Sequence, residues 1–206
     1  MELSELKITE FLSRLASIDP VPGGGSVSAF GAAMAAALSE MVANLTVGRK
    51  GFEAYEKEMR AIVQQARSLR EKLSKDIDKD ADAYSQVLEA YRLPNDTQEQ
   101  KNERSRAIQD GLKQAALVPL SVAKDAFELL DLAEKVAIRG NKNAVTDAAV
   151  AAMMARTAVL GALFNVKINL KSIRDNSFVK DVADQVQEIE SRVESKEKNI
   201  LNQIDL

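Results

Sequence analysis

Three consecutive glycines, Gly23 to Gly25, follow a Pro-Val-Pro sequence and stand directly before Ser26 and a run of small residues. If a helix begins here, its free backbone N–H groups lie beside its positive end. Such a site suits a carboxylate, a carbonyl oxygen or a developing negative charge. The alternative is a flexible turn with Ser26 as the N-cap, although a cap needs fewer glycines. We take Gly23, Gly24, Gly25 and Ser26 as candidate binding residues.

A second polar segment, Gly140 to Asp147, precedes a nearly uncharged stretch. Asp147 is the only carboxylate between Glu134 and Asp175, which makes it a candidate for proton transfer. The alternative is that it only favours the first turn of a helix, an effect of about 0.3–1 kcal/mol. The same segment supplies two amides, Asn141 and Asn143.

Two further amides, Asn165 and Asn169, are four residues apart and therefore share one face of the helix predicted for this region. Amides on a buried helix need hydrogen-bond partners. The partner is either a ligand or a neighbouring helix, so both asparagines are candidate binding residues.

Charged residues elsewhere give fewer candidates. Of the aspartates at positions 76, 78, 80 and 82, only Asp80, in line with Tyr84, is placed to face inward, and the others are expected on the solvated surface. Arg49 and Lys50 follow Gly48. They either complement the carboxyl end of the preceding helix or attract an anionic part of a ligand.

The composition limits the chemistry further. The chain of 206 residues contains no histidine and no cysteine, which excludes thiol nucleophiles, Ser-His-Asp triads, structural zinc sites and disulfides. A general acid or base must then be Asp, Glu, Lys or Tyr. We expect no metal site.

The charge pattern also excludes classes of partner. The formal net charge is −3, from 28 basic and 31 acidic residues, and no basic block is present, so we expect no nucleic-acid partner. The amino terminus lacks the apolar run of a secretory signal. A cytoplasmic location is the default expectation.

Long helices must position these residues, because glycine and proline are scarce and five of them fall within Pro20 to Gly25. Apolar spacing predicts helices over 4–18, 26–47, 53–92, 97–139, 144–170 and 177–204. Thr97 is the expected cap of the fourth helix, and Pro119 should kink or break it near Val118.

The expected fold class is all-α: a single domain, residues 1–206, built as a bundle of long helices around two buried apolar ones, 26–47 and 144–170. Either apolar segment is long enough for a membrane span. However, alanine dominates both, and Asp147, Arg156 and Asn165 flank or interrupt the second, so we expect no membrane association. Because 206 residues can hardly enclose two such helices, we expect a homodimer with one of them at or near the interface.

Taken together, these motifs resemble the cyclodeaminase/cyclohydrolase family of folate enzymes. The resemblance rests on five motifs in the same order over nearly the whole chain: PVPGGGS from Pro20, the pair Asp80 and Tyr84, VPL from Val118, GNKNAVTD from Gly140 and NVKINLKSI from Asn165. It implies an all-helical fold that dimerises, and one-carbon chemistry on tetrahydrofolate without a cofactor, the folate being the substrate. In animals this domain is fused behind a formiminotransferase domain. We expect the free-standing form here, working with a separate formiminotransferase.

The resemblance also implies roles for the candidate residues. Asp147 and Asp80 would transfer protons, the asparagines at 141, 143, 165 and 169 would orient the pterin and the formimino group, and the glycines would offer N–H donors or line the ligand's path. Arg49 and Lys50 would meet the glutamate tail. The leading hypothesis is conversion of 5-formiminotetrahydrofolate to 5,10-methenyltetrahydrofolate with release of ammonia. The alternatives are a methenyltetrahydrofolate cyclohydrolase and a non-catalytic helical module that only dimerises. A neighbouring gene for a formiminotransferase or for histidine degradation would favour the first.

Overall fold

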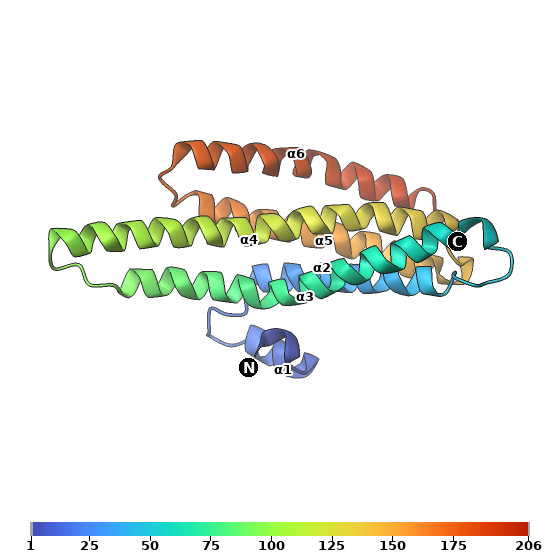
Figure 1. Ribbon diagram of the computed structural model, residues 1–206, viewed down its shortest axis with the longest axis horizontal. Helices are drawn as coiled ribbons and strands as arrows, with labels where there is room; N and C mark the ends of the chain where they lie inside the picture. The colour runs from blue at the N-terminus through green and yellow to red at the C-terminus, as the bar shows by residue number, and fades with distance from the viewer. Residues whose placement is uncertain (1, 206) are drawn as a thin grey trace.

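The computed structural model describes residues 2–205, and no strand occurs among them (Figure 1), which confirms the all-α prediction. Two short 3-10 turns, Leu3–Glu5 and Glu53–Tyr55, precede the first helix and α3, and a third, Lys142–Ala144, precedes α5. The helices in chain order are α1 (Ile8–Leu15), α2 (Gly24–Asn44), α3 (Glu56–Arg92), α4 (Gln98–Arg139), α5 (Val145–Leu170) and α6 (Asn176–Leu201).

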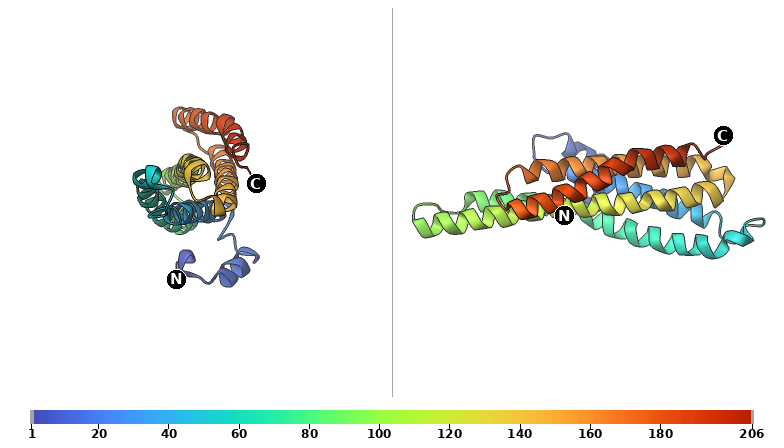
Figure 2. Two further views of the ribbon diagram at one scale, coloured as in Figure 1. Left: turned by 90° about the vertical axis from the view of Figure 1, so that its right-hand side faces the viewer. Right: turned by 90° about the horizontal axis from the view of Figure 1, so that it is seen from above.

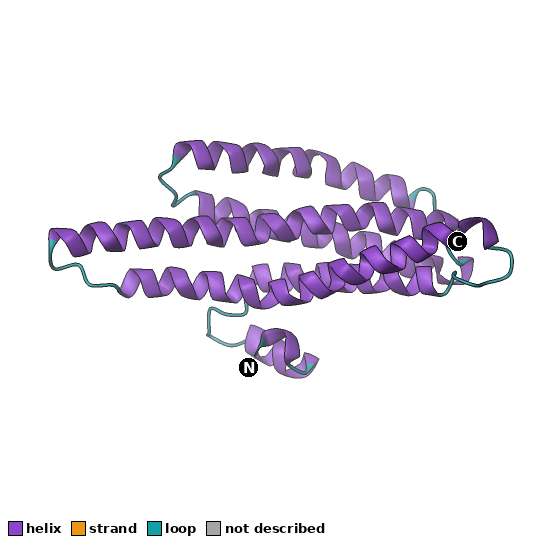
Figure 3. Ribbon diagram, in the orientation of Figure 1, coloured by secondary structure: helices purple, strands orange, loops and turns teal. Residues whose placement is uncertain are grey.

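Helices α2 to α5 form a four-helix bundle in which each packs against the next and α5 packs back on α2. Helix α6 covers α4 and α5, and α1 lies outside the bundle (Figure 2). The loops are short and lie at the ends of the long helices (Figure 3). Ala29, Ala32 and Ala36 of α2 are fully buried, and such small side chains let neighbouring backbones approach closely.

Most of the predicted helices are confirmed to within a few residues, but some predictions were wrong in detail. Helix α2 begins at Gly24 with Gly23 as its N-cap, so two of the glycines lie inside the helix and Ser26 is not its cap. The first predicted helix, 4–18, is shortened to α1 and the turn before it. Thr97 does cap α4, in a reciprocal arrangement with Gln100.

Pro119 does not break α4, which runs without interruption from Gln98 to Arg139. A proline inside a helix leaves the carbonyl four residues earlier without its N–H partner. Here that carbonyl belongs to Ala115, and the side-chain amide of Asn169 on α5 donates to it at 2.8 Å. A neighbouring helix thus supplies the hydrogen bond that the proline removes.

Helices α2 and α5 are long and apolar enough to cross a membrane by length and composition, and 67% and 44% of their most apolar windows are buried inside the structure. Their inner faces form the core, as predicted. Their outer faces are uncovered: Val27, Met34 and Met41 of α2 and Val150, Met153, Phe164 and Ile168 of α5 are exposed.

Candidate active site

A pocket of about 290 Å³ lies where α2 begins, between α3, α4 and α5. It collects residues from three of the motifs: PVPGGGS, the pair Asp80 and Tyr84, and NVKINLKSI. It is lined by Pro20, Val21, Gly23, Gly24, Gly25, Asp80, Ala81, Tyr84, Ala115, Asn165, Ile168 and Asn169. Larger hollows of about 500 and 480 Å³ lie further along α3 and α4, but neither contains a buried carboxylate.

Asp80 is the carboxylate of this pocket. Burial raises its pKa, and hydrogen bonds from the hydroxyl and backbone N–H of Ser26 oppose that rise. The Ser26 hydroxyl lies 3.1 Å from Asp80 Oδ2 and 3.0 Å from the carbonyl of Ile77. When Asp80 is ionised the hydroxyl can donate to it, and when Asp80 is protonated the hydroxyl can accept from it while donating to Ile77. The contact therefore serves both protonation states of Asp80.

The glycines bring the start of α2 close to these groups. A Cβ atom at Gly25 would collide with the Asp80 carboxylate, and one at Gly24 would lie 3.3 Å from Asn165 Nδ2. At Gly23 the nearest atom would be 3.5 Å away, an ordinary contact. Gly25 is thus required by the approach of Asp80, Gly24 is tight, and Gly23 acts as the helix cap.

The two asparagines of α5 line the same pocket. Asn165 Nδ2 donates to the carbonyl of Gly161, and Asn169 Nδ2 donates to those of Ala115 and Asn165. Because backbone carbonyls only accept hydrogen bonds, these contacts assign the nitrogen end of each amide. Among residues 2–205 the oxygens of the two amides accept no hydrogen bond from the chain, so both are available as acceptors for a ligand. The arrangement suits a ligand rich in N–H groups.

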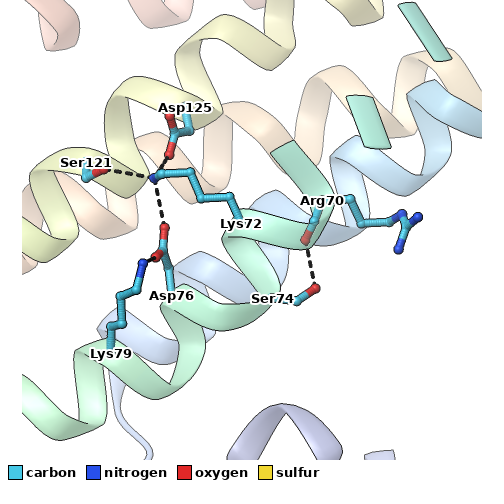
Figure 4. Close-up of polar contacts among 7 residues, drawn as sticks. All are labelled: Arg70, Lys72, Ser74, Asp76, Lys79, Ser121 and Asp125. Carbon is cyan, nitrogen blue, oxygen red and sulfur yellow. Dashed lines mark hydrogen bonds and ion pairs between the residues drawn. The ribbon is translucent and has the colours of Figure 1, made fainter. Parts of the chain in front are cut away.

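One turn before Asp80, α3 is fastened to α4 by a cluster of charges (Figure 4). Asp76 is 3% exposed, and it pairs with Lys72 at 3.0 Å and with Lys79 at 2.6 Å. Lys72 also binds Asp125 and Ser121 of α4. The expectation that only Asp80 of the aspartate series faces inward was therefore wrong for Asp76. Breaking such a buried pair is costly, so the cluster fixes the wall that carries Asp80.

The remaining predicted site residues lie at the opposite end of the bundle. Asp147 is half-buried in the first turn of α5. From Asp147 to Asn165 the helix rises 18 residues, or about 27 Å. Within one chain the structure therefore does not bring the two predicted proton-transfer aspartates together.

Asn141, at the same end of the bundle as Asp147, uses its polar groups in hydrogen bonds within the chain. Its backbone N–H donates to Thr46 at 2.8 Å, its side-chain nitrogen donates to the Leu45 carbonyl at 3.4 Å, and its side-chain oxygen accepts from the Asn143 N–H at 3.1 Å. It joins the start of α5 to the end of α2. Asn143 is exposed beside it.

Arg49 and Lys50 are exposed in the loop after α2. Gly48 and Gly51 flank them with φ angles of 71° and 92°, a conformation that glycine adopts without strain. The loop thus presents two cations at the same end of the bundle as Asp147.

Sequence reasoning missed six lining residues of the pocket: Pro20, Val21, Ala81, Tyr84, Ala115 and Ile168. The spacing of Tyr84, one helical turn after Asp80, was a usable signal. The others are apolar residues that look like core or loop in the sequence.

Comparisons with known proteins agree with this arrangement. The sequence model of the formiminotransferase-cyclodeaminase family matches residues 7–188. The chain is 40% identical over 174 residues to a methenyltetrahydrofolate cyclohydrolase of Methylorubrum extorquens, covering 84% of each chain. It is 36% identical over 195 residues to the formimidoyltransferase-cyclodeaminase of Sus scrofa, covering 95% of this chain and 36% of that one.

A solved structure shares the whole architecture. The formiminotetrahydrofolate cyclodeaminase of Thermotoga maritima superposes with a TM-score of 0.88 at 35% identity, covering 98% of both chains. Family match, sequence relatives and fold all agree, and the chain belongs to the formiminotransferase-cyclodeaminase family of folate one-carbon enzymes.

Proposed function

We propose that this protein is a formiminotetrahydrofolate cyclodeaminase, which converts 5-formiminotetrahydrofolate to 5,10-methenyltetrahydrofolate and ammonia. The observation that carries the proposal is the Asp80 pocket, which one half-buried carboxylate and two asparagines line together with the start of a glycine-rich helix. The named relatives act on folates, which argues against the alternative of a non-catalytic module.

The reaction needs a proton carrier. The nitrogen at position 10 attacks the formimino carbon held on the nitrogen at position 5, and the proton lost from the attacking nitrogen must reach the departing amine. Asp80 accepts the first proton, and its raised pKa keeps the protonated form accessible. Its contact with Ser26 serves both forms.

The remaining pocket residues position the substrate. The oxygens of Asn165 and Asn169 accept from the N–H groups of the formimino group and the pterin, and Tyr84 lines the side. Holding the folate bent brings the two nitrogens together, and ring closure is then intramolecular. The protein needs no metal or other cofactor for this chemistry.

A methenyltetrahydrofolate cyclohydrolase is the second candidate, favoured by the 40% identity to the enzyme of that name over 84% of both chains. In that reaction Asp80 would activate a water molecule at the methenyl carbon. The same pocket serves both reactions.

The deciding experiment offers the purified protein each folate separately and follows the absorbance of the methenyl compound. A cyclodeaminase makes it rise with 5-formiminotetrahydrofolate, and a cyclohydrolase makes it fall with 5,10-methenyltetrahydrofolate. If neither folate is converted, both candidates fail.

We also propose that the chain acts as a homodimer in the cytoplasm, on folate delivered by a separate formiminotransferase in histidine degradation. The uncovered outer faces of α2 and α5 support the dimer, because monomers rarely expose apolar patches of this extent. A monomer at micromolar concentration by light scattering would contradict it.

A further inference from the structure

The two groups of polar residues singled out by the sequence lie at opposite ends of one helix pair. The Asp80 pocket lies at the start of α2 and the end of α5, whereas Arg49, Lys50, Asn143 and Asp147 lie at the other end. Asp147 lies in the first turn of α5, and no ion pair or side-chain hydrogen bond engages it within residues 2–205. Its carboxylate is available to something outside the chain.

The outward positions between the two ends hold no charged residue, and the nearest cation is Lys167, whose Nζ lies 5.6 Å from the centroid of the Phe164 ring. We call this surface the α2–α5 face. Its outward positions recur every three or four residues along α2, and along α5 except for a gap of seven between Thr157 and Phe164; on α5 they are all apolar or threonine. On α2 they are Val27, Phe30, Met34, Ala37 and Met41, and on α5 Val150, Met153, Thr157, Phe164 and Ile168. Phe164 is 68% exposed. The face reaches the pocket itself, because Ile168 lines both.

The register of the two helices makes this face suited to a second copy. Gly24 faces Asn165, Ser28 faces Gly161, and Gly31 faces Ala158, so α2 and α5 are antiparallel. Met34 is at the middle of α2, and the midpoint between Asp147 and Asn165 falls beside Thr157. A two-fold axis that lies in the plane of the face at this point, perpendicular to the helices, packs the face on its copy. It places each end of the face against the opposite end of the partner's face.

The size of the face also fits a dimer. Two helices about 30 Å long and about 10 Å wide offer on the order of 600 Å² per copy. A standard interface takes about 800 Å² per partner, and α1 adds to the edge through Phe11, which packs on Phe30. A lipid surface is the competing occupant, and the experiments below separate the two.

We propose that two copies pair antiparallel through the α2–α5 face, so that each active site is completed by Asp147, Arg49 and Lys50 of the partner subunit. This rests on the proposed function. The partner subunit's Asp147 comes to lie beside Asn165, across the open side of the Asp80 pocket. Asp80 then takes the proton from the attacking nitrogen, and Asp147 of the partner subunit protonates the departing nitrogen, which leaves as ammonia. Both carboxyl groups regain their starting protonation states by proton exchange with water. The two cations face the carboxylates of the glutamate tail.

Complementation between two inactive variants tests this. Asp80→Asn and Asp147→Asn are expected to lose roughly 10²–10⁴-fold in turnover as homodimers, the usual contribution of one acid or base. Co-expressed with different tags and purified through both, the mixed dimer has one site with both aspartates intact. It should regain about half of wild-type activity, since one site of two is restored.

Each other outcome overturns the proposal. If both aspartates served a site within one chain, the mixed dimer would have no intact site and would stay inactive. If Asp147→Asn alone keeps near wild-type turnover, Asp147 has no part in the reaction. A wild-type protein inactive on both folates would instead overturn the proposed function.

A charge at the centre of the face tests the pairing itself. Thr157→Glu should give a folded, inactive monomer, because Thr157 is exposed and bonds only its own helix at 2.9 Å. Ser191→Glu on the exposed side of α6 is the matched control and should stay dimeric and active. A folded Thr157→Glu monomer with full activity, or a wild-type monomer that binds lipid vesicles, would show that the face serves another purpose.

Discussion

Asn169 donates its side-chain amide to the carbonyl of Ala115 at 2.8 Å, the carbonyl that Pro119 leaves without a helical partner. Two motifs far apart in the sequence, VPL and NVKINL, are therefore linked by one hydrogen bond. Asn169 also lines the Asp80 pocket, so the proline of α4 helps to determine how Asn169 is oriented.

This link predicts a coupling between the two residues. Asn169→Ala should cost about 1–3 kcal/mol, because it leaves a buried carbonyl unsatisfied. In a Pro119→Ala background the new backbone N–H can satisfy Ala115, and the cost of Asn169→Ala should fall. A double-mutant cycle from denaturant unfolding measures the difference. Equal costs in both backgrounds would mean that the hydrogen bond is not what couples them.

A methyl group at Gly25 should damage the active site without unfolding the helix. Gly25→Ala places Cβ against the Asp80 carboxylate, so the carboxylate must move, and we expect turnover to fall roughly 10²-fold, as misplacement of about 1 Å can cost. Gly31→Ala is the control, since its Cβ would meet Met154 and Ala158 at 3.7 and 3.8 Å. The control should keep its activity and gain about 0.5–1 kcal/mol in stability. Comparable activity in the two variants would contradict the prediction.

Replacing Asp80 should separate stability from activity. Burial raises the pKa of Asp80, which means that the ionised form is less stable in the folded protein than in the unfolded chain. The stability that Asp80 contributes is therefore fully present below the ordinary aspartate pKa. It is lost as the pH rises through the higher pKa that Asp80 has in the folded protein. Asp80→Asn should lose turnover while its melting temperature at pH 7 equals or exceeds that of the wild type. The advantage should shrink in acid, where both side chains are neutral. A large loss of stability at pH 7 would mark Asp80 as structural.

The pH dependence of the reaction should reflect the same group. Because Asp80 must be ionised to accept the first proton, kcat/KM should rise with pH through a pKa above the ordinary aspartate value. Ser26→Ala removes a hydrogen bond that stabilises the ionised form, and should move this limb to higher pH. Steady-state rates across the pH range measure both limbs. An unmoved limb in Ser26→Ala would assign it to another group.

Turnover should be indifferent to chelators. The chain has no histidine or cysteine, and no cluster of three acidic side chains suited to a metal occurs in residues 2–205. The pocket offers a single carboxylate, Asp80, whereas hard cations take several oxygen ligands. Assays with and without EDTA check this, and a loss of activity that magnesium or manganese restores would contradict it.

Helix positions could be predicted because the apolar spacing is regular and because Thr97 marks the start of α4. The pocket could be predicted in part: the triple glycine, Asp80, Asn165 and Asn169 do meet there. What spacing alone could not provide was the distance between Asp80 and Asp147, since it depends on the directions in which α2 and α5 run. The unbroken helix at Pro119 could not be predicted either. The hydrogen bond that replaces the missing backbone bond comes from Asn169, which is fifty positions later and on another helix.

The connector before α2 has a practical consequence for handling the protein. Pro20 and Val21 form one wall of the pocket, and the segment leading to them is held to the bundle through Phe11 on Phe30. A fusion partner or a truncation at the amino terminus is expected to displace Pro20 and Val21, and a tag there is therefore expected to alter substrate affinity. The end of α6 lies away from the pocket, and purification tags, including the pair needed to isolate mixed dimers, belong at the carboxyl terminus.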